Sequence, residues 1–249
     1  MRVREFKGYV HALNVQPQAP SNKPLQPTSG GPASVRRTEA MPPHLTDDDV
    51  RAEYVRAMGP ELGNLCHELQ NDFAWLNQKW TEFGELFQRG QARIDLLNAT
   101  ASNFFYFLNR LQYEDALLHI ARITDPAESF GRANLSVRRL APAIPEQRLR
   151  LAVEGATAET LETCEFARAW RNKRLAHADL DTLRQGKAAG LPEVTEALIG
   201  QALKSIRRPL QLVDESYGMV PSSSVHDPWG ARSLVYFLER GRSGDRARD

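Results

Sequence analysis

Apolar residues recur at steps of three and four through most of the chain, and this spacing constrains the fold more than any other feature. The clearest case is a predicted helix face that carries Ile94, Leu97, Ala101, Phe104, Phe105, Leu108, Leu111, Leu117, Leu118, Ile120 and Ile123. A period near 3.6 is typical of an amphipathic helix, whereas a half-buried strand alternates every two residues. No stretch of β-branched residues has a period of two, so the sequence predicts an all-α fold.

Helix-stopping residues divide this pattern into separate helices. Thr46 with three acidic residues suits a helix N-terminus, Gly59-Pro60 interrupts the pattern, and Asp125-Pro126 ends the third helix. Asn134 or Ser136 is placed to cap the short helix that follows. The predicted helices cover about residues 47–58, 62–87, 94–123, 136–140, 146–180, 192–213 and 229–238.

Composition and helix lengths predict one folded domain between two unstructured ends. Residues 1–43 are rich in proline and lack apolar periodicity, so we expect a disordered leader. Residues 44–240 form the helical domain, and residues 241–249 form a frayed, charged tail. Long helices with short connections favour an up-down bundle with a short C-terminal satellite helix.

Charge and cysteine content exclude several functional classes. The 32 basic residues nearly balance the 31 acidic ones, so a nucleic-acid partner requires a local basic patch. The two cysteines, Cys66 and Cys164, have no nearby Cys or His at metal-ligand spacing, so we expect neither a metal nor a cofactor. No apolar run reaches the roughly 18 residues of a membrane span, and no secretory signal is present. The sequence therefore predicts a soluble, cytoplasmic protein that does not enter membranes.

Residues 170–179, Trp-Arg-Asn-Lys-Arg-Leu-Ala-His-Ala-Asp, combine an arginine, an amide and a histidine within one predicted helix. Metal-independent cleavage of RNA needs a base for the ribose 2′-hydroxyl, a cation for the charged phosphorane and an acid for the leaving 5′-oxygen. His177 suits the base or the acid because imidazole exchanges protons near neutral pH. Arg171 suits the cation because its planar guanidinium group matches two phosphate oxygens. Asn172 is placed to hold a phosphate oxygen or to orient His177.

The arginine–histidine spacing alone has little weight. An arginine followed by a histidine after four to six residues arises about once by chance in a chain of this size. Arg4 with His11, and Arg37 with His44, also fit the spacing. The longer block of residues 171–177 is far more specific than the spacing by itself.

Regular helix geometry does not bring the two catalytic candidates together. Six residues separate Arg171 from His177 by about 9 Å along the axis and about 120° around it. Two explanations remain open: a distortion near Ala176, or a site assembled from two copies of the helix across a two-fold axis. His177 shares a face with Phe166 and Trp170, whereas Arg171 lies on another.

Structural roles compete with the catalytic ones. Arg171 fits an internal ion pair, and His177 fits an ordinary surface or core position. Asp181, one turn later, either orients the imidazole or solvates the helix end. Arg168, Lys173 and Arg174 are candidate binding residues for RNA phosphates, although a basic helix C-terminus is also expected from the helix dipole.

Two further expectations concern the third helix and the aromatic residues. Arg122 and Asp125 are three positions apart and predict an ion pair within that helix. Four aromatic residues are expected in the core rather than in contact with bases: Tyr54, Trp75, Trp80 and Phe83.

The motif resembles that of the HEPN superfamily, in which an arginine, usually followed by a polar residue, precedes a histidine by a few positions. Arg171-Asn172 and His177 match it. Residues 120–126, Ile-Ala-Arg-Ile-Thr-Asp-Pro, together with Asn98, Phe104-Phe105 and Asn134-Leu-Ser, resemble the AbiU-type branch involved in abortive infection. The resemblance covers about residues 50–240.

The resemblance implies a helical bundle, a homodimer formed through the motif helices, and a metal-independent endoribonuclease of phage defence or a toxin–antitoxin system. It gives catalysis to Arg171 and His177 with support from Asn172, and it implies RNA as a partner. A cognate antitoxin would belong to that setting. One branch is silenced by modification of a tyrosine two positions after the histidine, and here that position is Asp179. The competing interpretation is a non-catalytic binding module whose motif helix serves only as a dimer interface.

Overall fold

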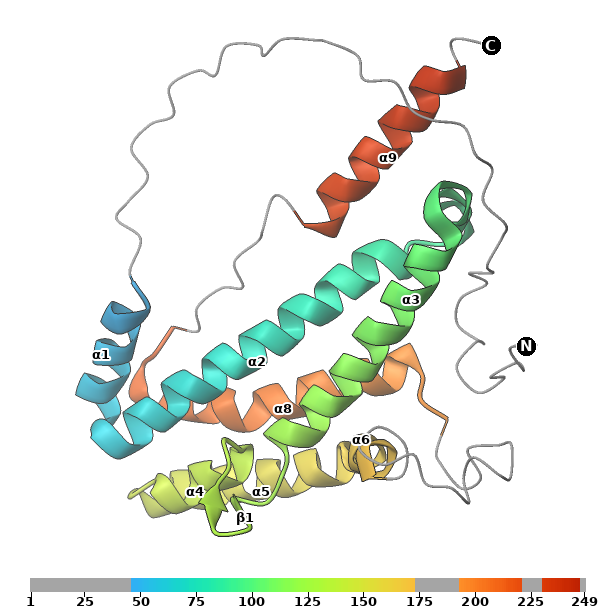
Figure 1. Ribbon diagram of the computed structural model, residues 1–249. Coiled ribbons are helices and arrows are strands. Elements are labelled where there is room, and N and C mark those ends of the chain that lie inside the picture. Colours follow the sequence, from blue (N-terminus) through green and yellow to red (C-terminus); the bar gives the residue numbers. More distant parts are fainter. Residues whose placement is uncertain (1–45, 173–192, 221–229, 247–249) are drawn as a thin grey trace, which may run out of the picture.

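The computed structural model describes residues 46–172, 193–220 and 230–246, and it confirms the predicted all-α bundle. Figure 1 shows the long helices running in alternating directions, with α9 at the end of the bundle away from α4 and α5. The predicted leader, residues 1–43, lies outside the described residues. No helix in the described part of the chain is long and apolar enough to cross a membrane.

Helices α1 (Asp47–Met58) and α2 (Pro60–Phe87) confirm the predicted break at Gly59-Pro60. Thr46 caps α1 in a reciprocal capping box with Asp49, which satisfies backbone N–H groups that the first helical turn leaves without partners. Gly59 adopts φ 80°, a conformation that costs glycine little. The chain therefore reverses direction within one residue, and α1 packs back along α2.

Helix α3 (Gln91–Ile123) ends where the sequence predicts, but it does not present one uninterrupted apolar face. Ala101 has φ −157° and ψ 68°, and this kink breaks the helical phase. As a result Phe105 is buried, while Phe104 and Leu111 are 59% and 63% exposed. The expectation that these two residues belong to the core is wrong.

Three of the four aromatic residues assigned to the core pack there. Tyr54 and Phe83 are buried, and Trp80 stacks on Phe83 with ring centroids 4.6 Å apart. Trp75 is 60% exposed, and its ring lies 5.7 Å from the ammonium group of Lys79, so its placement in the core is wrong.

The segment after α3 contains a small hairpin that the periodicity did not predict. Strands β1 (Glu128–Ser129) and β2 (Arg132–Ala133) pair in an antiparallel arrangement. Ser136 then caps a 3₁₀ turn, η1 (Val137–Arg139), which leads into α4 (Leu140–Ala143). Of the two proposed caps, Ser136 holds that position.

The predicted motif helix is broken in two. Helix α5 (Gln147–Thr163) ends at Cys164, and α6 (Glu165–Trp170) follows directly. The interruption lies at Cys164, within the stretch predicted as one helix over residues 146–180. The chain continues at Arg171 and Asn172 in a turn of the wider π type.

The last two helices begin or end later than predicted. Helix α8 (Glu196–Tyr217) starts after a Thr195 cap and continues through Pro209. Helix α9 (Ala231–Arg246) is the satellite helix, and it extends beyond the predicted end at Leu238 into residues assigned to the frayed tail. The Glu82 side chain accepts the N–H of Ala231 and so anchors the start of α9 on α2.

Two hydrophobic cores are formed by the residues that the structure describes. The larger joins α1, α2, α4, α5, α6, α8 and the C-terminal half of α3. The smaller joins the end of α2 and the start of α3 to Ala231 and Val235 of α9. Trp80 and Tyr113 pack against both cores. The larger core fixes α6 against the C-terminal end of α3, where the motif begins.

Candidate functional site

The motif begins at the end of α6, which packs against α3. Trp170 and Phe166 are 3% and 7% exposed and pack in the larger core. Arg171 is partly buried, and Asn172 is exposed. His177, Lys173 and Arg174 lie outside the described residues, so their predicted roles remain predictions.

Arg171 forms an ion pair with Asp125, just beyond α3. Its Nη1 donates to Oδ1 of Asp125, and its Nε donates to Oδ1 of Asn172 at 3.1 Å. The side chains of Arg171 and Asp125 are 26% and 20% exposed. Two of the three nitrogens of the guanidinium group are thus held in place, and the Asn172 amide orients Arg171.

The backbone beneath Asp125 is itself fixed by hydrogen bonds. The Ser136 hydroxyl, which is buried, donates to the Asp125 carbonyl at 2.6 Å. The Thr124 hydroxyl donates to the Ile120 carbonyl at 2.7 Å and ties the residue to the last turn of α3. These hydrogen bonds therefore fix the backbone of Asp125, the counter-ion of Arg171.

Two more arginines converge on the same turn. Arg168 donates from Nη2 to the Leu161 carbonyl at 2.6 Å and from Nη1 to the Thr124 hydroxyl at 3.4 Å. Arg138, from η1, donates from Nε to the Thr124 carbonyl at 3.1 Å. Burial and the nearby charge of Arg168 lower the pKa of Arg138, against the opposing influence of Asp125. The guanidinium group of Arg168 already donates to an internal carbonyl group and an internal hydroxyl group. Its predicted role in phosphate binding stays a prediction.

The predicted ion pair between Arg122 and Asp125 is wrong. Arg122 donates instead to Asp72 of α2 at 2.7 Å. Asp72 also accepts from the buried imidazole of His119, whose Nε2 lies 3.0 Å from the carboxylate. These two partners lower the pKa of Asp72 despite its partial burial, which raises it. The carboxylate of Asp125 is therefore available to pair with Arg171.

Sequence spacing could not identify Asp125, Ser136 or Arg138 as members of the site. Arg171 and Asp125 are 46 positions apart, so no helical repeat relates them. The available signal was the Thr124-Asp125-Pro126 segment, which carried part of the family resemblance. Arg138 had no such signal.

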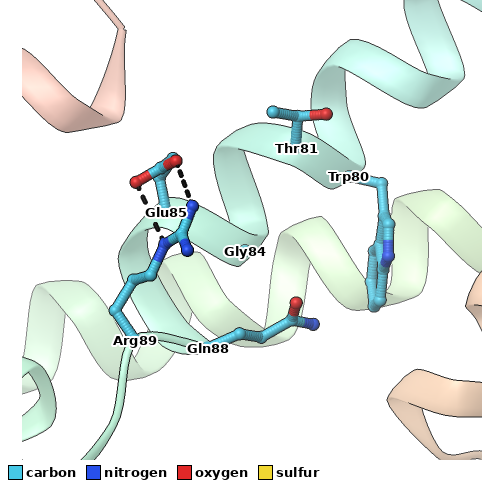
Figure 2. A pocket seen from close by; sticks show the side chains of 6 residues that line it. All are labelled: Trp80, Thr81, Gly84, Glu85, Gln88 and Arg89. Atoms are coloured by element: carbon cyan, nitrogen blue, oxygen red, sulfur yellow. Dashed lines mark hydrogen bonds and ion pairs between the residues drawn. The ribbon is translucent and has the colours of Figure 1, made fainter.

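The structure also contains a pocket of about 270 Å³, which lies elsewhere. Figure 2 shows its lining along α2, with Glu85 bound to Arg89 through both carboxylate oxygens. Hydrogen bonds from Arg89 and Arg232 lower the pKa of Glu85 to about 2. Its carboxylate is thus committed to ion pairs, and the pocket brings no catalytic candidate together.

Potential metal-ligating side chains are scattered in the part of the chain that the structure describes. Among residues 46–172, 193–220 and 230–246, no three His, Cys, Asp or Glu side chains come together as ligands for a metal ion. Cys66 and Cys164 are both buried, and burial raises the pKa of Cys66 to about 12 and that of Cys164 to about 11. Neither thiol is therefore a ready thiolate ligand or nucleophile.

A family model for AbiU2, HEPN_AbiU2, matches residues 59–222, which include α2 to α8 and the whole motif. The chain belongs to the AbiU2 family of HEPN domains. The AbiU2 match confirms the resemblance drawn from the sequence and makes the protein a HEPN-like abortive-infection module. No curated protein and no solved structure matches this AbiU2 chain.

Proposed function

We propose that this AbiU2-family protein is a metal-independent endoribonuclease of a phage-defence or toxin–antitoxin system. In the proposed reaction, His177 exchanges protons and Arg171 stabilises the negative charge that develops on the phosphorane. The 2′-oxygen forms a bond to phosphorus as its proton passes to a base, and the bond from phosphorus to the 5′-oxygen breaks as that oxygen takes a proton. The products are a 2′,3′-cyclic phosphate and a 5′-hydroxyl end.

The orientation of Arg171 is the observation that supports the proposal. Asp125 and Asn172 bind Nη1 and Nε, and the side chain retains 26% exposure. A guanidinium group fixed by a carboxylate needs no reorganisation when a phosphate arrives, which is the arrangement that electrostatic catalysis requires. The dimer that would bring His177 to this point is part of the proposal.

A second candidate function is a non-catalytic binding module. It is favoured by the internal contacts of the motif arginines, since Asp125, Thr124 and Leu161 provide acceptors for Arg171 and Arg168 within one chain. Trp170 is buried in the larger core, so a dimer interface would use other residues of the motif segment.

Cleavage of a labelled RNA in EDTA separates the two functions. We expect the wild type to release a 2′,3′-cyclic phosphate end, and we expect Arg171→Ala and His177→Ala to lose about 100-fold or more in rate. Arg139→Ala, a change in an arginine outside the motif, is the matched control and should leave the rate unchanged. Cleavage that requires added metal, or that survives both motif substitutions, would contradict the proposal.

The assembly is tested by measuring molar mass in solution by light scattering. The proposed site requires a dimer, and mixing Arg171→Ala with His177→Ala should restore part of the activity if two chains contribute to one site. A monomeric, fully active wild type would exclude the shared site.

A further inference from the structure

We propose that Arg138, together with Arg171, forms a binding site for consecutive backbone phosphates of a nucleic-acid strand at the C-terminal end of α3. The inference rests on the proposed nuclease function and extends it to a residue outside the motif. Arg138 belongs to η1, which the chain reaches only after the hairpin, whereas Arg171 follows α6.

The charges around Thr124 and Asp125 do not balance. Three guanidinium groups, those of Arg138, Arg168 and Arg171, contact these two residues. Asp125 is the one carboxylate that pairs with them in the described part of the chain. The helix dipole of α3 adds about half a negative charge at this end. More than one positive charge therefore remains, and such an excess favours an anionic ligand.

The cluster also has hydrogen-bond donors to offer. Arg138 uses Nε to bind the Thr124 carbonyl, and Arg171 uses Nη1 and Nε. Within the residues that can be placed, no acceptor is found for either Nη of Arg138 or for Nη2 of Arg171. Both side chains are partly exposed, so these terminal nitrogens can meet phosphate oxygens, which guanidinium groups bind at two points.

Rigid support distinguishes this cluster from ordinary surface arginines. The Ser136 hydroxyl links the backbone of Asp125 to that of Arg138, because it donates to the Asp125 carbonyl and accepts the Arg138 backbone N–H at 3.3 Å. Arg138 and Arg171 are thus positioned by the same short segment. Consecutive phosphates along a strand present repeated charge to two such fixed cations, and their binding releases counterions.

The test measures binding of a fluorescent single-stranded oligonucleotide built from 2′-deoxynucleotides, which lacks the hydroxyl that cleavage requires. Fluorescence anisotropy is recorded for the full-length chain at several NaCl concentrations. Arg138→Gln should weaken binding about tenfold at low salt and reduce the slope of log K against log[NaCl] by about 0.7, the value for one phosphate contact on a single strand. Arg139→Gln, in the same turn, should change neither quantity.

Arg138→Lys provides a second variant that does not depend on tolerance of the glutamine. Lysine retains the charge but lacks the planar group that donates to Thr124 and to a phosphate together. We expect the salt slope to remain and the affinity to fall severalfold. Thermal melting of each variant, followed by circular dichroism, confirms that the binding measurements were made on folded protein.

Several results would overturn the inference. They are an unchanged affinity and slope for both Arg138 variants, equal effects of Arg138→Gln and Arg139→Gln, and failure of the wild type to bind the oligonucleotide. Binding of an oligoglutamate peptide in preference to the oligonucleotide, with the same dependence on Arg138, would assign the cluster to an acidic protein segment instead. Failure of RNA cleavage with Arg138-dependent binding intact would refute the nuclease and leave the binding site standing.

Discussion

Asp125 and Asp214 both bind side chains from other helices, but the two carboxylates differ in burial and in the charge of their partners. Asp125 faces a cation and is partly exposed at the end of α3. Asp214 of α8 is 1% exposed and accepts from neutral donors, the Tyr54 hydroxyl at 3.2 Å and the Gln70 amide at 2.5 Å. Burial raises the pKa of Asp214 to about 6, although the bond from Tyr54 lowers it.

This difference indicates that Asp214 stabilises the fold, whereas Asp125 lies where a ligand can reach it. The contacts of Asp214 join α1, α2 and α8, and Asp214 itself is buried, so changes there should appear in stability. Asp125 stands beside three arginines that retain exposure, so changes there should appear in binding and catalysis with little effect on folding. Three substitutions test this division, from the largest expected effect on stability to the smallest.

Gly63→Ala should disrupt the Asp214 region most. An added Cβ would lie 2.6 Å from both the Tyr54 carbonyl oxygen and the Val55 Cα, so α1 would have to move away from α2. We expect a loss of about 3 kcal/mol in the free energy of unfolding, measured by urea denaturation. Gly155→Ala is the matched control, because its added Cβ meets nothing within 4 Å, and it should stabilise α5 by up to about 1 kcal/mol. Equal effects of the two substitutions would contradict the close approach of α1 and α2.

Asp214→Asn should remove one component of the pH dependence of stability. The folded pKa of Asp214, about 6, lies above the unfolded value of 3.8, so the folded state holds this proton more tightly. The stabilisation is fully present below the unfolded pKa and is lost as the pH rises through the folded pKa. Between pH 4 and pH 7 the wild type should lose on the order of 2–3 kcal/mol relative to the asparagine variant.

Parallel denaturation curves of these two proteins at pH 4.5, 6 and 7.5 provide the measurement. Carboxyl groups with lowered pKa, such as Glu85, oppose this trend but are present in both proteins and cancel in the difference. A difference in unfolding free energy that stays constant with pH would mean that Asp214 is ionised throughout and is not sealed from water.

Asp125→Asn should alter folding least. The ion pair with Arg171 is partly solvated, so its loss should cost about 1 kcal/mol or less. Under the proposed function, RNA cleavage should fall about tenfold through kcat, because Arg171 loses the charge that orients it. Asp125→Glu keeps the charge and should recover part of the rate. A stability loss as large as that of Gly63→Ala would mean that Asp125, like Asp214, mainly stabilises the fold.

Much of the fold could be predicted from the sequence because its determinants are local. Thr46 caps α1, Gly59-Pro60 separates two helices, and Asp125-Pro126 ends α3, each through the chemistry of adjacent residues. The apolar periodicity predicted the helical class correctly. It failed at Phe104 and Leu111 because the kink at Ala101 shifts the face of α3 that meets the core.

The candidate site divides in the same way. The sequence by itself determined that Arg171 and Asn172 belong to a family motif, since their order along the chain carries that information. Only the tertiary structure decided that Arg171 pairs with Asp125, that Arg122 turns to Asp72, and that Arg138 joins the cluster. These contacts depend on how α6 and η1 pack against the C-terminal end of α3. Burial of residues far apart in the chain sets that packing, and no local spacing encodes it.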